Sequence, residues 1–219
     1  MNTMKKYSMI ILISLFSLNT MAQSFVLRGG FNLASIKISD ADDDETMNTK
    51  SHTGFNFGAF ADFPINDFLS VETGLAFTKK GVNMVLEEDG YSFTNKVNLN
   101  YLSIPIALRA KKELGDNTSL YGSFGPYLAF GLSGKTKMTM EYQGQTEEGD
   151  SESIIWGSDP DEAQLKRFDF GLTFGAGVEF NSILLGLSYD LGLSNISAYQ
   201  EDGAGLKNRV FSINVGYRF

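Results

Sequence analysis

The last eleven residues of the chain, 209–219, alternate between apolar and polar side chains. The apolar positions are Phe211, Ile213, Val215, Tyr217 and Phe219, and the intervening ones are Ser212, Asn214, Gly216 and Arg218. Because successive side chains of a strand point to opposite faces, this pattern predicts a β-strand with one apolar face. A strand left unpaired at the end of a chain invites aggregation. The pattern therefore favours a closed barrel in which the last strand pairs with the first.

Seven further segments show similar alternation. The eight predicted strands are residues 23–38, 53–63, 68–80, 98–111, 118–131, 167–180, 183–196 and 209–219. Their connections alternate between long (39–52, 83–97, 132–166 and 197–207) and short (64–67, 112–117 and 181–182), and 83–97 reads as extensions of its two flanking strands. Antiparallel membrane barrels have long external loops and short periplasmic turns. We therefore predict an all-β protein, an eight-stranded antiparallel up-and-down transmembrane β-barrel.

Two prolines lie inside predicted strands. Pro105 and Pro126 cannot donate a ladder hydrogen bond, and proline in a sheet is normally confined to edges or bulges. Since a closed barrel has no edge, we expect a local bulge at each of them.

The first 22 residues form a separate unit. Lys5 and Lys6 precede an apolar run from Met9 to Leu18, and small residues end at Ala22. This order is typical of a secretory signal peptide, here cleaved before Gln23. The run is too short for a membrane-spanning helix, which needs about 20 apolar residues. We predict a signal peptide over 1–22 and a barrel domain over 23–219.

Composition narrows the choice of partners. The chain has 26 acidic residues against 18 lysines and arginines, a net charge of −8, and removal of residues 1–22 takes away two lysines and no acid. Such an acidic protein is a poor binder of nucleic acid. The absence of cysteine excludes disulfides and thiolate metal sites. No cofactor is predicted.

Short motifs spread over the chain carry a resemblance to a known group. They are Ala22-Gln23, Tyr101 to Leu108 (YLSIPIAL), Gly125-Pro126-Tyr127, Phe170 to Gly177 (FGLTFGAG), Tyr189 to Asn195 (YDLGLSN) and Tyr217-Arg218-Phe219. In order and spacing the chain resembles the small outer-membrane β-barrel proteins of Bacteroidetes, the PorT-like group. The resemblance implies an eight-stranded barrel in the outer membrane and no single activity. It also implies that the terminal aromatic residue, Phe219, is the signal read by the barrel-assembly machinery.

The predicted strand parity places six charges inside the barrel at one level near the periplasmic end. The cations are Arg28, Arg109 and Arg218, and the anions are Asp62, Glu72 and Glu179. A charge in a narrow lumen is costly unless it is paired. The interior of an eight-stranded barrel is just wide enough for side chains to fill it. We therefore hypothesise a salt-bridged plug and no open channel.

Other chemistry-bearing residues have simpler interpretations. His52 is the only histidine and ends the first long loop without a nucleophile motif nearby. The acidic run Asp40, Asp42, Asp43, Asp44 and Glu45 lacks the glycine and terminal glutamate of an EF-hand. Both are expected to be solvated loop residues. Trp156, in the longest connection, is either a partner-binding spot or an interface anchor.

The leading interpretation is a non-enzymatic outer-membrane barrel with a structural, adhesion or interaction role. Its predicted partners are outer-membrane lipid, lipopolysaccharide and the barrel-assembly machinery. The alternatives are a lipid-active membrane enzyme and a soluble lipocalin-like carrier. The carrier would need apolar residues inside and polar ones outside, the reverse of the parity assigned here.

Overall fold

The computed structural model describes residues 24–39, 48–88, 91–115, 117–142, 145–199 and 205–219. Its strands are β1 (Ser24–Ser39), β2 (Asn48–Pro64), β3 (Leu69–Glu88), β4 (Tyr91–Gly115), β5 (Thr118–Tyr142), β6 (Gln145–Ser153), β7 (Phe168–Phe180), β8 (Ile183–Gly192) and β9 (Gly205–Arg218). No α-helix occurs in these ranges, so no described helix can cross a membrane.

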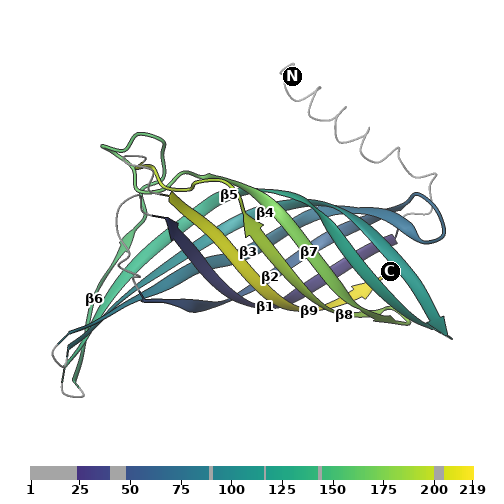
Figure 1. Ribbon diagram of the computed structural model, residues 1–219, viewed down its shortest axis with the longest axis horizontal. Helices are drawn as coiled ribbons and strands as arrows, with labels where there is room; N and C mark the ends of the chain where they lie inside the picture. The colour runs from purple at the N-terminus through teal and green to yellow at the C-terminus, as the bar shows by residue number, and fades with distance from the viewer. Residues whose placement is uncertain (1–23, 40–47, 89–90, 116, 143–144, 200–204) are drawn as a thin grey trace, which may run out of the picture.

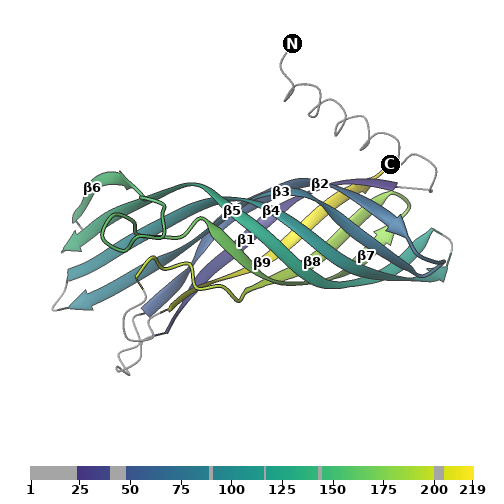
Figure 2. The same ribbon diagram turned by 90° about the horizontal axis from the view of Figure 1, so that it is seen from above.

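Eight of the described strands close into a barrel (Figures 1 and 2). Neighbouring strands run antiparallel in the order β4-β3-β2-β1-β9-β8-β7-β5, and β5 pairs with β4 to complete the ring. The first and last strands pair over fourteen positions, from Val26 opposite Arg218 to Ser39 opposite Gly205. The predicted all-β up-and-down barrel, closed by its last strand, is therefore confirmed.

The strands β3, β4 and β5 are longer than the sequence pattern predicted. Residues 132–142 continue β5, and residues 145–153 form β6, which pairs only with β5. The prediction of one long loop over 132–166 is therefore wrong in its first half, whereas the strand extensions within 83–97 are confirmed. These extensions carry Lys, Thr, Glu and Met, and their polar and apolar residues no longer alternate regularly. Figure 1 shows them projecting beyond the ring, at the end opposite the C-terminus.

The apolar faces of the ring strands point outward. Phe31 is 78% exposed and Ile213 59%, whereas the adjacent Asn32 and Ser212 are buried inside. This is the reverse of a soluble carrier, because here lipid rather than water solvates the outer surface. The lipocalin-like alternative is thereby excluded.

The expectation of bulges at the two prolines is wrong. Pro105 lies opposite Tyr127, and the β4–β5 register is the same on both sides of it. Pro126 lies opposite Leu172 within an uninterrupted β5–β7 register. The chain therefore keeps its pairing and omits a hydrogen bond at each proline, since a long ladder on both sides fixes the backbone there.

Candidate functional site in the barrel lumen

The structure brings the six predicted lumen charges together as one chain of alternating ion pairs. Each comes from a different strand: Arg28 from β1, Asp62 from β2, Glu72 from β3, Arg109 from β4, Glu179 from β7 and Arg218 from β9. The chain begins at Arg28, which lies 2.5 Å from Glu72. The Arg109 guanidinium then joins Glu72 at 2.9 Å to Glu179 at 3.1 Å. Arg218 continues it, with its Nε 2.9 Å from Glu179 and its Nη1 2.7 Å from Asp62.

Arg109 is the centre of this network. Only 1% of its side chain is exposed, and its guanidinium lies 3.9 Å from the centroid of the Tyr121 ring. A guanidinium suits this position because its planar fork donates to two carboxylates at once and because it is more weakly hydrated than an ammonium group. Lys111 adds a partly exposed contact to Glu179 at 3.4 Å. The charge network thus closes the barrel near the short turns.

A second buried network lies farther along the lumen, and the sequence analysis did not identify it. The Lys80 ammonium is 2.9 Å from Asp169, and both side chains are fully buried. The same carboxylate accepts hydrogen bonds from Asn208 at 2.9 Å and Ser194 at 2.7 Å. The alternation of the strands already placed Lys80 and Asp169 inside the barrel, so the sequence indicated that both charges face the lumen. The partner of Lys80 could not be chosen, because that choice depends on the stagger of strands β3 and β7.

A small cavity of about 80 Å³ separates the two charge networks. Polar side chains such as Asn56, Ser123, Asp190 and Asn214 line it. Tyr121 reaches into this space because Gly186 lies opposite its hydroxyl, where an added Cβ would come within 2.2 Å of the oxygen. The cavity is large enough for a few water molecules, and the ion pair of Arg28 and Glu72 is part of its lining.

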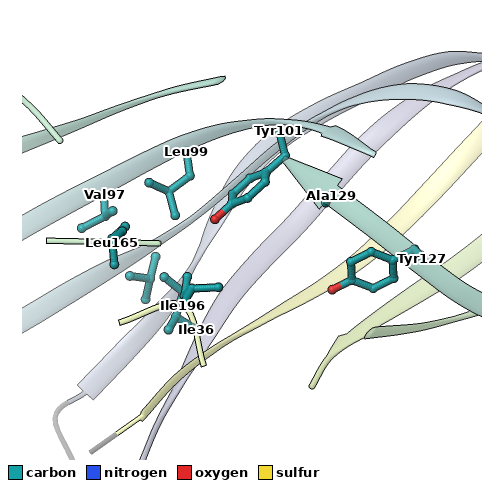
Figure 3. Close-up of a cluster of buried hydrophobic side chains, with 9 residues drawn as sticks. Ile36, Val97, Leu99, Tyr101, Tyr127, Ala129, Leu165 and Ile196 are labelled. Atoms are coloured by element: carbon teal, nitrogen blue, oxygen red, sulfur yellow. The ribbon is translucent and has the colours of Figure 1, made fainter. Parts of the chain in front are cut away.

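A cluster of buried apolar side chains lies next to Lys80 and Asp169 and includes Tyr127, whose ring is 4.6 Å from the Lys80 ammonium (Figure 3). The buried members are Ile36, Val82, Val97, Leu99, Tyr101, Tyr127, Ala129, Leu165 and Ile196. Leu165 and Ile196 come from the connections that follow β6 and β8, which fold back onto the barrel through a β-bridge between Leu165 and Ser197. We call this set the apolar cap. The lumen therefore contains three consecutive layers: the charge network, the Lys80–Asp169 network and the apolar cap.

Trp156 is partly buried beside this layer. It packs against the apolar cap, and its ring meets that of Tyr101 edge-on, with centroids 5.8 Å apart. The partner-binding and membrane-anchor interpretations of Trp156 stay predictions. The sequence did not indicate this packing, because it includes residues from other strands such as Tyr101.

His52 also lies elsewhere than expected. It is part of β2, opposite Ala34, and its Nδ1 is 3.2 Å from the amide oxygen of Asn83. The prediction that it ends a loop is wrong, because β2 begins at Asn48. Within the described ranges no group of three or more acidic or histidine side chains is placed to hold a metal ion. The acidic run 40–45 and the predicted signal peptide lie outside the described residues.

The terminal aromatic residue lies beside the first strand. The Phe219 amide donates a 2.8 Å hydrogen bond to the carbonyl oxygen of Phe25, and its ring lies 4.9 Å from that of Tyr217. Its side chain is 69% exposed on the outer face, at the short-turn end. The chain end therefore completes the seam between β1 and β9.

Comparison with known proteins identifies the class. Residues 21–198 match the family described as outer membrane protein beta-barrel domain. The chain belongs to this family. It is accordingly an outer-membrane protein. A comparison with curated proteins finds no match.

Solved structures of several outer-membrane barrels are similar to the chain. The attachment invasion locus protein Ail of Yersinia pestis is 19% identical, covers 91% of this chain and 100% of its own, and has a TM-score of 0.38. OprG from Pseudomonas aeruginosa is 16% identical, with coverages of 91% and 97% and a TM-score of 0.46. Neisserial surface protein A is 14% identical, with coverages of 89% and 95% and a TM-score of 0.42.

Proposed function

We propose that the protein is a non-enzymatic barrel with a sealed lumen, acting through its surfaces in a structural, adhesion or interaction role. The observation that carries this proposal is the three-layered filling of the lumen. An ion crossing the barrel would have to separate Arg109 from Glu72 and Glu179, break Lys80 from Asp169, and then pass the apolar cap. Each buried pair loses several kcal/mol when a partner is removed, about 3–5 kcal/mol. The side chains that would line a channel thus hold one another in place.

Planar-bilayer recording with the purified full chain tests the sealed lumen. We expect no stable conductance, and we expect the variant Lys80→Ala combined with Leu165→Ala to show more frequent transient openings than the native protein. A matched control is Leu185→Ala, which truncates an exposed side chain on the outer surface. Stable, ion-selective conductance from the native chain would refute the proposal.

The projecting sheet of β3 to β6 supports an interaction role. Leu86 pairs with Phe93, and Tyr91 pairs with Tyr142, so their side chains share one face. Leu86 and Met138 on this face are 61% and 57% exposed. Exposed apolar patches of this kind typically mark contact surfaces.

An ion pair attaches the outermost strand to this sheet. Lys137 on β5 lies 2.5 Å from Glu148 on β6, and this hydrogen-bonded ammonium lowers the pKa of the Glu148 carboxyl. The carboxylate therefore stays ionised down to lower pH than an isolated glutamate, and the contact persists over the same range.

The remaining parts of the proposal concern location and partners. We propose that outer-membrane lipid and lipopolysaccharide surround the outward-facing apolar side chains of the ring strands, which form an apolar belt. We also propose that Phe219 is the signal read by the barrel-assembly machinery. The YLSIPIAL and YDLGLSN motifs support membership of the PorT-like group of Bacteroidetes. Mature protein is expected to begin at Gln23, and N-terminal sequencing of the membrane fraction tests this. Material that retains residues 1–22 would contradict it.

A lipid-active enzyme is the alternative that this proposal rejects. The nearest polar partner of His52 is the amide of Asn83, which is not a nucleophile. The hydroxyl of Ser194 donates to Asp169, and no histidine lies within hydrogen-bonding distance of it in the described ranges to activate it as a nucleophile. A lipid hydrolysis assay with the folded protein should therefore show no turnover.

A further inference from the structure

A groove opens on the outer wall of the barrel where β5, β7 and the end of β8 meet. Its apolar walls are Phe130, Phe168, Phe170 and Leu193, all of which face outward and are 43–52% exposed. The groove encloses about 590 Å³. That is within the range of about 300–1,000 Å³ typical of small-molecule sites. Phe168 begins β7, so the groove lies at the long-connection end of the apolar belt, opposite the end where the chain terminates.

Two cations stand beside these apolar walls. Lys166 and Arg167 line the groove and form no ion pair with any acid in the described ranges. Ser158 and Asn195 add polar groups to the same rim. The groove is thus amphipathic, because its apolar walls are rimmed by polar and positively charged groups. This differs from the acidic character of the chain as a whole, whose net charge is −8.

The cationic rim is held in place by the barrel. The Arg167 carbonyl accepts a 2.7 Å hydrogen bond from the Gly131 amide, and its guanidinium donates to the Gly131 carbonyl at 2.8 Å. The guanidinium also lies 5.8 Å from the Phe130 ring and 5.7 Å from the Trp156 ring. The backbone amide of Lys166 donates to Ile196 at 2.8 Å. A rim fixed in this way loses little conformational entropy on binding a ligand.

We propose that this groove binds the phosphorylated glycolipid of the outer leaflet. Lys166 and Arg167 would contact a phosphate, and the groove formed by Phe130, Phe168, Phe170 and Leu193 would receive part of an acyl chain. Charge complementarity selects the headgroup, since arginine and lysine are the usual phosphate partners. The inference rests on the proposed function in one respect, namely that the long-connection end faces the outer leaflet.

Native mass spectrometry of the detergent-purified full chain tests the site. The probes are lipid A carrying two phosphates, the same lipid with its phosphates removed, and inorganic phosphate. We expect the phosphorylated lipid to bind at least about tenfold more tightly than the dephosphorylated one, a difference of about 1.4 kcal/mol. Inorganic phosphate at low millimolar concentration should not displace the lipid, because phosphate has no acyl chain to pack against the apolar walls. Equal binding of the two lipids, or displacement by phosphate, would overturn the proposal.

Two variants and a matched control locate the binding. The double variant Lys166→Gln with Arg167→Gln should weaken binding of phosphorylated lipid A by about tenfold or more. Arg167→Lys keeps the charge but not the geometry of the guanidinium at Gly131, and it should bind more tightly than Arg167→Gln. The control Lys112→Gln removes an exposed cation on β4 at the opposite rim, where it pairs with outward-facing Leu120, and should change nothing.

Two further outcomes are informative. Heat-modifiable gel migration shows whether each variant is folded, and if the double variant does not fold, Arg167→Gln alone carries the comparison. An equal loss of binding in Lys112→Gln and the groove variants would mean general attraction to the barrel rim and would refute a site. A barrel that conducts ions but still binds at the groove would refute the sealed lumen and leave the lipid site standing.

Discussion

At the scale of single residues, the lumen network explains why this barrel can place charges inside a membrane protein. Arg109 shares its guanidinium between two carboxylates, and Arg218 does the same for Glu179 and Asp62. Each of the six charges in this network therefore meets at least one opposite charge. A network of this kind is costly to disrupt at any one point, because the remaining buried charges lose their compensation.

The first prediction concerns the centre of that network. Arg109→Met should destabilise the folded barrel by about 3–5 kcal/mol, since it leaves two buried carboxylates without their shared partner. Adding Glu72→Gln should restore part of the loss. Urea unfolding in detergent micelles measures both variants, with Lys112→Met on the exposed face of β4 as the control. Simple additivity of the two changes would show that Arg109 and Glu72 are not coupled.

The alternation of side chains along each strand predicts which charges point inward, so this part of the site could be predicted from the sequence. All six predicted charges face the lumen and join one network. What parity cannot give is the stagger between strands, which decides that Lys80 meets Asp169 and not Asp190. It also cannot show that Trp156 turns back into the barrel, because that depends on contacts between separate connections.

At the scale of strands, hydropathy reports a strand only where one of its faces touches lipid. β7 matches its predicted range closely, whereas β9 begins four residues earlier than predicted, at Gly205, and β8 ends four residues earlier than predicted, at Gly192. In the projecting parts of β4 and β5, neither face contacts lipid. Polar residues such as Lys96 and Lys137 therefore pair in a regular ladder there, although the sequence itself looks like that of a loop. Hydrogen bonding to long neighbouring strands, rather than residue pattern, determines these extensions.

The closing strand gives the second prediction. Deleting Phe219 should lower the yield of barrel inserted in cells more than it lowers refolding yield in detergent. The reason is that Phe219 contributes one hydrogen bond to Phe25 and an exposed ring, which is a small part of the β1–β9 seam. Comparing the two yields by heat-modifiable migration measures the difference. The control is Phe180→Ala, an equally placed exposed aromatic on β7. Equal losses in cells and in detergent would argue against a recognition role.

At the scale of the whole molecule, the two ends of the barrel differ in length and filling. One end carries short turns, both chain termini of the described barrel and the charge network. The other carries the projecting sheet, the apolar cap and the groove with Lys166 and Arg167. Membrane barrels place short turns in the periplasm and long extensions outside. We therefore expect the short turns in the periplasm and the projecting sheet outside the cell.

The last prediction tests that orientation through three exposed lysines. Lys96 and Lys135 lie on the projecting sheet, and Lys112 lies at the short-turn rim. A membrane-impermeant amine-reactive probe applied to intact cells should label Lys96 and Lys135, while Lys112 should react only after lysis. Peptide mapping by mass spectrometry reads the three sites within one sample, and an unlabelled periplasmic protein shows that the outer membrane stayed closed. Labelling of Lys112 alone in intact cells would invert the topology. The projecting sheet would then face the periplasm, and the groove would face the inner leaflet.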